Sequence, residues 1–238
     1  MSDLEELPAR LAAVQARIAE ACARGRRRPE DIVLVGVSKT HPAAAVAAVW
    51  RAGLRVFGEN RVQEAVAKSR ELGEAGPEWH LIGPLQSNKV RLALELFRTI
   101  HSIDRPSIAA ALDREAGARG LRLTGFLEVN VGAEASKHGF LPADLAAVAR
   151  PLADLQHLRI AGLMAIPPQS DEPEDSRRWF IRLRELRDEL AARPEWSARW
   201  EGSGGWLSMG MSHDFAVAVE EGATHVRVGT ALFGSRGI

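Results

Sequence analysis

Residues 32–39 read Ile32-Val33-Leu34-Val35-Gly36-Val37-Ser38-Lys39, an apolar run that ends in a lysine. A short continuous apolar run rich in β-branched residues is typical of a buried strand. A helical pattern follows at once, with Pro42 at the point where a first turn begins. A strand followed by a helix is the repeating unit of a parallel sheet, so this stretch predicts an α/β fold.

The same alternation continues along the rest of the chain. Candidate strands cover 32–37, 55–57, 79–83, 98–102, 122–129, 158–164, 204–208 and 225–229. Candidate helices cover 42–52, 60–73, 87–97, 105–118, 142–154, 174–191 and 213–221, with a short one near the C-terminus. Eight such units in 238 residues favour a closed (β/α)8 barrel of the TIM type, formed as one domain over 1–238. An open doubly wound sheet is the alternative.

An amphipathic helix precedes the first strand and is expected to lie outside the barrel. Its apolar stripe, at spacings of three and four residues, consists of Leu4, Leu7, Leu11, Val14, Ile18 and Cys22. Cys22 is the single cysteine of the chain, which excludes an internal disulfide. Its place on the stripe predicts a buried thiol.

The overall composition limits the partners that we expect. The formal net charge is zero, so no basic excess indicates nucleic acid or an acidic membrane surface. The N-terminus is acidic, and no window approaches the ~18 apolar residues of a membrane span. The seven histidines show no metal-ligand spacing, so no metal site is predicted. We expect a cytoplasmic protein, and a monomer.

Lys39 is the candidate for covalent chemistry. Lysine occurs only at 39, 68, 89 and 137, so 27 of the 31 basic residues are arginine. Where only positive charge is needed, this chain uses arginine. A retained lysine can therefore be needed as an amine, because arginine does not deprotonate to form an imine. The structural alternative is a lysine that extends from a strand end into solvent.

Two segments near the last strand ends have the features of phosphate-binding loops. Ser208-Met209-Gly210-Met211-Ser212 places a glycine and hydroxyls ahead of a helix, and Gly229-Thr230 follows the last strand. Backbone N–H groups and a helix N-terminus can converge on an anion there. Each segment alone would be an ordinary N-cap. Barrel phosphate sites are often built from the loops after strands seven and eight, so the pair predicts one.

A phosphate site combined with an imine-forming lysine suggests pyridoxal 5′-phosphate (PLP) as cofactor, with the aldehyde on Lys39. Arg227 lies just before the Gly229-Thr230 turn and would donate to the ring nitrogen without giving up its proton, leaving the cofactor a poor electron sink. The alternative for Arg227 is an ion pair with Glu128 or Glu59. Asn60 is a candidate cofactor contact or the cap of helix 60–73. Met164 is a candidate for packing on the ring or for the core.

Longer blocks of the chain resemble the pyridoxal phosphate homeostasis protein family. The blocks are 37–40, 57–64, 79–89, 162–167, 207–212 and 226–234, with 79–89 and 207–234 the most specific. The resemblance implies a barrel related to the N-terminal domain of alanine racemase and a Schiff base at Lys39, with no established turnover. It puts phosphate contacts at Ser208, Met209, Ser212, Gly229 and Thr230, and the ring-nitrogen partner at Arg227. Where the family usually has Tyr, this chain has Arg61.

The expected function is to hold, buffer or deliver PLP in vitamin B6 homeostasis, without catalysis, and apo PLP-dependent enzymes are the expected recipients. An amino-acid racemase on the same barrel is the main alternative. Such an enzyme needs a second base opposite the lysine, a Tyr in the alanine racemases, and this chain has no Tyr. A scaffold or sensor is a further alternative. Lys137, after the fifth strand, is either a second amine that eases release or a solvated loop residue.

Overall fold

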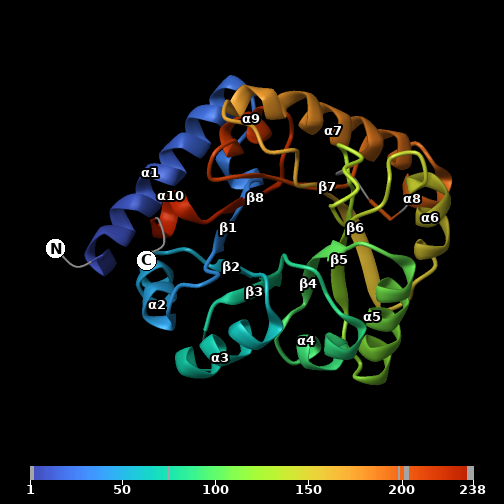
Figure 1. The fold of residues 1–238 in the computed structure, drawn as a ribbon, viewed down its shortest axis with the longest axis horizontal. Coiled ribbons are helices and arrows are strands. Elements are labelled where there is room, and N and C mark those ends of the chain that lie inside the picture. The colour runs from blue at the N-terminus through green and yellow to red at the C-terminus, as the bar shows by residue number, and fades with distance from the viewer. Residues whose placement is uncertain (1–2, 74–75, 198, 201–203, 235–238) are drawn as a thin grey trace.

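The computed structural model describes residues 3–73, 76–197, 199–200 and 204–234. Eight parallel strands close into a barrel in chain order, with the last strand paired to the first (Figure 1). This confirms the predicted (β/α)8 barrel. The strands are β1 (Val33–Val37), β2 (Val56–Glu59), β3 (Glu78–Leu81), β4 (Thr99–Ile103), β5 (Leu123–Glu128), β6 (Leu158–Met164), β7 (Trp206–Met211) and β8 (His225–Val228).

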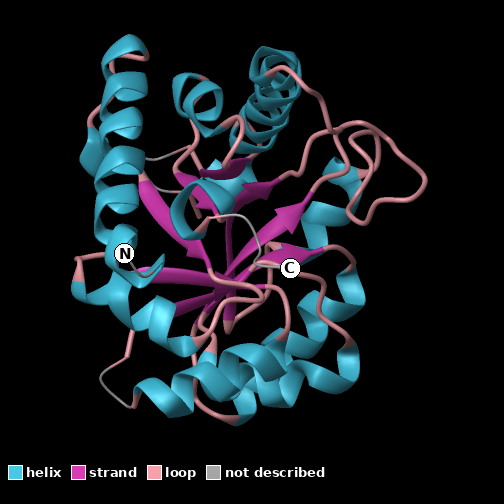
Figure 2. Cartoon of the chain, turned by 60° about the vertical axis from the view of Figure 1, so that its left-hand side comes forward, coloured by secondary structure: helices cyan, strands magenta, loops and turns pink. Residues whose placement is uncertain are grey.

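Helices surround the strands (Figure 2). They are α1 (Asp3–Arg24), α2 (Ala43–Arg51), α3 (Val62–Leu72), α4 (Val90–Leu96), α5 (Pro106–Ala118), α6 (Leu145–Leu152), α7 (Arg177–Ala191), α8 (Pro194–Ser197), α9 (Phe215–Glu220) and α10 (Thr230–Phe233). Short 3₁₀ turns cover Pro29–Asp31, Ser87–Lys89 and Pro173–Ser176. None of the described helices is long and apolar enough to cross a membrane.

Helix α1 is the predicted additional helix and lies against α2, α9 and α10 on the outside of the barrel (Figure 1). The members of its apolar stripe from Leu7 to Cys22 are buried, including the Cys22 thiol. Leu4, in the first turn, is instead 41% exposed. The buried stripe therefore begins one turn later than the spacing predicts.

Strand β7 begins and ends later in the chain than the predicted 204–208. The apolar run suggested an end at residue 208, but the strand continues to Met211, with a shift of register against β8 between Ser208 and Met211. Gly210 makes this possible, since its φ is +89° and a Cβ there would lie 2.5 Å from the Ala218 Cβ. Ser208 and Met209 consequently lie within the strand, and only the end of the predicted phosphate segment opens as a loop.

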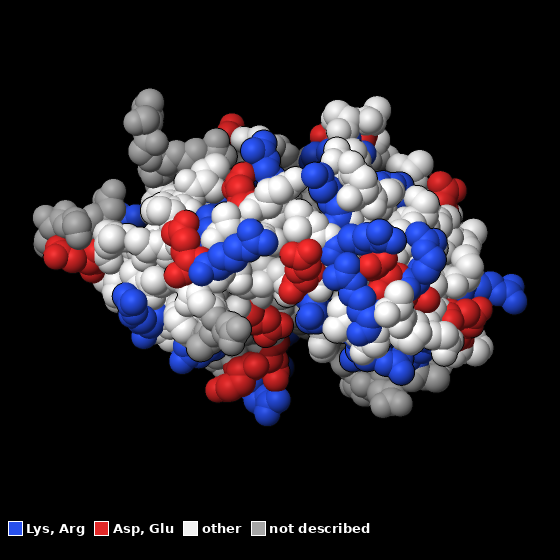
Figure 3. All heavy atoms as spheres, turned by 90° about the horizontal axis from the view of Figure 1, so that it is seen from below, with Lys and Arg blue, Asp and Glu red and all other residues white. Residues whose placement is uncertain are grey.

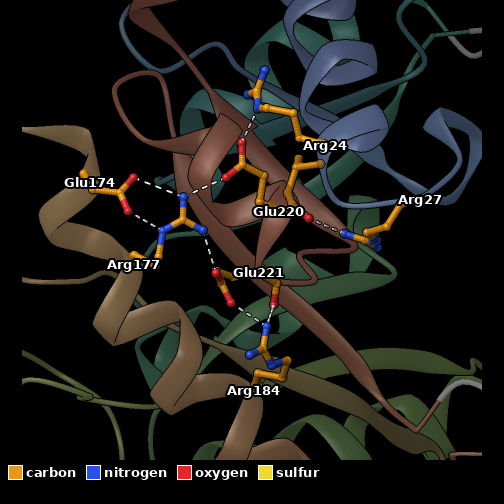
Figure 4. Close-up of polar contacts among 8 residues, drawn as sticks. Arg24, Arg27, Glu174, Arg177, Arg184, Glu220 and Glu221 are labelled. Carbon is orange, nitrogen blue, oxygen red and sulfur yellow. Dashed lines mark hydrogen bonds and ion pairs between the residues drawn. The ribbon is translucent and has the colours of Figure 1, made fainter.

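Ion pairs connect the outer helices (Figure 4). Arg177 at the start of α7 contacts Glu220 at 2.7 Å and Glu221 at 2.6 Å, and Glu220 also pairs with Arg24 of α1 at 2.6 Å. Arg184 contacts Glu221 from the next turns of α7. A network of this kind holds α1, α7 and α9 in fixed relation, more firmly than an isolated surface pair would. In the face shown in Figure 3, basic and acidic side chains are interspersed.

Candidate functional site

A cavity of about 510 Å³ collects residues from the carboxyl ends of the strands and the loops after them. This is the end of a barrel at which active sites are built. Six of the predicted site residues line the cavity: Lys39, Asn60, Ser212, Arg227, Gly229 and Thr230. The structure thus brings together groups that are up to 191 positions apart in the chain, from Lys39 to Thr230.

Lys39 follows β1 directly and is exposed to the cavity. The turn that carries it is tight: the N–H of His41 donates to the Ser38 carbonyl at 3.0 Å, and Thr40 has a φ of +68°. A non-glycine residue in the left-handed region is uncommon and marks a turn held by its surroundings. The amine is therefore presented from a constrained piece of backbone rather than from a mobile loop.

The constraint comes from a buried polar cluster beneath Lys39. The Ser38 hydroxyl donates to Glu59 Oε1 at 2.7 Å, and Lys68 Nζ reaches from α3 to donate to the same oxygen at 2.5 Å and to the Ser38 carbonyl at 2.7 Å. Ser38 and Glu59 have no exposed surface, and Lys68 is 8% exposed. Buried charges need such partners. The cluster thus fixes the residue that precedes the reactive amine.

Sequence reasoning missed the role of Lys68. The available signal was the same as for Lys39: one of only four lysines in a chain that otherwise uses arginine. The sequence analysis also gave Glu59 as an alternative ion-pair partner of Arg227. The structure pairs Glu59 with Lys68 instead. Of the remaining lysines, Lys137 lines the cavity. Its Nζ donates to the Pro167 carbonyl at 3.0 Å and forms an ion pair with Glu134.

Arg227 presents a buried guanidinium to the cavity. It is 4% exposed, and it donates to the Ser208 hydroxyl at 2.7 Å and to the Ala165 carbonyl at 2.9 Å. Burial lowers its pKa from 12.5 to about 10, against the opposing effect of Glu128 and Asp214. The group therefore stays cationic at neutral pH and can donate to a ligand, but it does not release a proton there.

The loops after β7 and β8 meet at Ser212. The backbone N–H groups of Gly229 and Ala231 donate to the Ser212 Oγ at 3.0 and 3.2 Å, so two amides and a hydroxyl converge at the start of α10. Both amides are taken by the Ser212 Oγ, and the Ser212 O–H is the donor that this arrangement can offer to an anion in the cavity. With Lys39 and Arg227 on the same cavity, the donor set fits PLP: an amine for the aldehyde, the Ser212 hydroxyl at the start of α10 for the phosphate and a cation for the ring nitrogen.

Three predicted site residues lie away from the cavity surface. Ser208, Met209 and Met164 are fully buried, and none of them lines the cavity. Ser208 is hydrogen-bonded to Arg227, so it lies one step behind the surface. Met209 belongs to the hydrophobic core, and Met164 ends β6. Asn60 lines the cavity and is not the helix cap, because α3 has Arg61 at its N-cap.

Glu128, at the end of β5, is a cavity residue that the sequence suggested only as an ion-pair partner. Burial raises the pKa of its carboxyl from 4.5 to about 7, and the charge of nearby Asp104 adds to the rise, while Arg227 and His138 oppose it. A carboxyl that takes up and releases a proton near neutrality suits a site that must handle a proton. The signal in the sequence was its place at a strand end.

We expect the raised pKa of Glu128 to make stability depend on pH. Between pH 4.5 and about 7 the carboxyl ionises in the unfolded chain but stays protonated in the folded one, so stability falls as the pH rises through this window. Glu128→Gln removes this loss. In urea unfolding of the cofactor-free protein, the variant should exceed the wild type by about 1–3 kcal/mol at pH 8 and equal it near pH 4.5. Glu71→Gln is the matched control on an exposed helix site; a difference for Glu128→Gln that is constant with pH would contradict the assignment.

Comparison with known proteins agrees with this geometry. The sequence model described as "Alanine racemase, N-terminal domain" matches residues 10–237. The chain is 44% identical to the pyridoxal phosphate homeostasis protein of Aquifex aeolicus, over 95% of this chain and 97% of that one. It is 47% identical to the protein of the same name from Pseudomonas aeruginosa, over 95% and 94%. The solved structure of PipY from Synechococcus elongatus with PLP bound superposes with a TM-score of 0.82, at 40% identity and with 96% and 100% coverage. The chain, with Lys39 and Arg227 facing one cavity of a (β/α)8 barrel, belongs to the pyridoxal phosphate homeostasis protein family.

Proposed function

We propose that this protein binds PLP covalently at Lys39 and holds it, without turnover, as part of vitamin B6 homeostasis in the cytoplasm. The observation that carries the proposal is that Lys39, Arg227, and Ser212 with the Gly229-Thr230 turn all line one cavity. The PLP-bound structure of a 40% identical relative supports it.

Each residue has a distinct part in this proposal. Lys39 is the amine that takes the aldehyde carbon, with loss of water. Ser212, Gly229 and Thr230 hold the phosphate. Ser208 and Met209, which were also predicted as phosphate contacts, are buried in β7 and do not line the cavity. Arg227 donates to the ring nitrogen and stays protonated, because its pKa of about 10 is well above neutral. PLP is an electron sink when its ring nitrogen is protonated, and a guanidinium at that position keeps it a weak one.

A racemase on the same barrel is the second candidate, and the match to the alanine racemase N-terminal domain favours it. Racemisation needs a base on each face of the substrate carbon. The chain has no Tyr to supply the second base. Glu128, with its pKa of about 7, is one cavity group that could serve as that base, and His138 and His213 also line the cavity.

One experiment separates the two candidates. The purified protein is incubated with PLP, and its absorbance is recorded with and without borohydride. An imine band that disappears on reduction supports covalent binding, and no band contradicts it. The loaded protein is then incubated with L-alanine and L-serine, and the enantiomers are measured. D-amino acid formed no faster than with free PLP supports a carrier; steady racemisation above that level favours the enzyme.

Delivery is the part of the proposal that concerns partners. We propose that the protein acts as a monomer and passes PLP to apo PLP-dependent enzymes. Lys137 is the second amine at the cavity, where it would take the aldehyde from Lys39 and ease release. Its contacts with Pro167 and Glu134 hold the ammonium at the rim, and a purely structural role is the alternative.

A further inference from the structure

A chain of hydrogen-bonded side chains crosses the barrel interior from the cavity. Arg227 Nη1 donates to the Ser208 Oγ at 2.7 Å, and this oxygen lies 2.7 Å from His101 Nδ1. His101 Nε2 lies 2.9 Å from His80 Nδ1, and His80 Nε2 lies 3.0 Å from a carboxylate oxygen of Glu78. The five groups come from β8, β7, β4 and β3, so the closure of the barrel creates the chain.

The two ends of this chain lie in different surroundings. Ser208 and His101 have no exposed surface, and His80 is 3% exposed. The Glu78 side chain is 60% exposed, and Glu78 is the first residue of β3. Arg227 lines the cavity at the carboxyl ends of the strands, whereas Glu78 lies at an amino end. The chain therefore links the cavity with solvent at the opposite end of the barrel.

With both imidazoles neutral, the donors and acceptors allow one direction for the chain. A guanidinium only donates and a carboxylate only accepts, which sets both ends. Ser208 then donates to His101 Nδ1, His101 Nε2–H donates to His80 Nδ1, and His80 Nε2–H donates to Glu78. Every link is satisfied with both imidazoles neutral and protonated on Nε2. The opposite direction would require a protonated Glu78 and would leave Ser208 accepting from both Arg227 and His101.

The surroundings of the chain keep its centre neutral. Burial, together with the charges of His80, His225 and Arg227, lowers the pKa of His101 well below 6.5. His225 lies beside the chain against Phe126 and Trp206. Burial and the charges of His80 and Arg227 lower the pKa of His225 to about 3. The charges of Glu128 and Asp214 act on Arg227 and oppose the lowering of its pKa by burial. The hydrogen bond from His80 lowers the pKa of Glu78, so its carboxylate stays ionised at the solvent end.

We propose that His80 and His101 are positioning residues that hold Arg227 through Ser208, and that proton uptake at the Glu78–His80 end is transmitted along this chain to the ligand cavity. A second proton on His80 turns its Nδ1 into a donor. His101 must then accept on Nε2 and carry its proton on Nδ1, which points it at Ser208. The Ser208 hydroxyl can then no longer donate to His101 Nδ1, and its oxygen receives hydrogen bonds from both His101 and Arg227. The hydrogen bond from Arg227 to Ser208 is weakened as a result. Only the last step, at the ligand, depends on the proposed function.

The first test reads the chain without any ligand. Two-bond ¹H–¹⁵N correlations of ¹⁵N-histidine in the cofactor-free protein at pH 8 report which ring nitrogen carries the proton. We expect both His80 and His101 to be protonated on Nε2 alone. On acidification, the His101 signals should change to those of the Nδ1–H form while the ring stays neutral. His101 protonated on Nδ1 at pH 8 would overturn the proposal, whether or not PLP binds.

The second test changes the solvent end. Glu78→Gln keeps an acceptor for His80 but removes the negative charge that stabilises a protonated His80. The change of His101 from the Nε2–H to the Nδ1–H form should therefore move to lower pH by about 0.5 unit. The shift is modest because Glu78 is exposed. The fall in PLP affinity at acid pH should move to lower pH by the same amount. In that pH range the variant should bind PLP about threefold more tightly than the wild type. Glu71→Gln, an exposed carboxylate of α3 outside the chain, should match the wild type. Identical switch midpoints for Glu78→Gln and wild type would overturn the coupling; a moved switch without PLP binding would count against the proposed function alone.

Discussion

Lys39→Ala is expected to abolish the borohydride-reducible adduct with PLP, the largest functional change that any single substitution should cause. Alanine removes the amine and leaves the Ser38–Glu59–Lys68 cluster beneath it in place, so the fold is expected to persist. Non-covalent binding through Arg227 and Ser212 should remain, at lower affinity. Absorbance before and after reduction, followed by mass spectrometry of the labelled peptide, measures the change.

The matched control for this substitution is Lys89→Ala. Lys89 is half-buried near the same end of the barrel but does not line the Lys39 cavity. It should keep the wild-type adduct. If reduction of the wild type labels Lys137 instead of Lys39, the assignment of the covalent site is wrong.

Lys68→Met is expected to cause the largest loss of stability. It leaves the carboxylate of Glu59, which has no exposed surface, with the Ser38 hydroxyl as its remaining partner. Removing one partner of a buried ion pair costs about 3–5 kcal/mol, because the other charge remains uncompensated. Urea unfolding near neutral pH measures the loss.

A second variant shows whether the lost partner is the cause. The double substitution Glu59→Gln with Lys68→Met removes both charges and should recover most of the stability, since the buried carboxylate is gone. Lys89→Met controls for the loss of a lysine in the same region. If Lys68→Met costs less than about 1 kcal/mol, or if the double variant is no more stable than the single one, the pair does not act as described.

Much of the fold was readable from local patterns in the chain. Short apolar runs and helical periodicity alternate eight times, and each pattern depends on neighbouring residues. Strand ends carry Lys39, Arg227 and the Gly229-Thr230 turn, and parallel strands in a barrel place their carboxyl ends at one face. The prediction of one cavity followed from these two facts, and all four residues line it.

The amino-acid sequence by itself therefore determined eight strand–helix units of a parallel sheet, and it placed the candidate site at the carboxyl ends of the strands, because both follow from local alternation. The number of units favoured a barrel over an open doubly wound sheet, and the structure shows the closed barrel. Only the tertiary structure decided which polar groups meet inside. The pairing of Lys68 with Glu59, and the chain from Arg227 to Glu78, join residues of different strands and helices. Such contacts depend on the closure and register of the barrel, including the shift at Gly210 that keeps Ser208 within β7. No local spacing encodes them, since hydrogen-bond partners are chosen by distance in space.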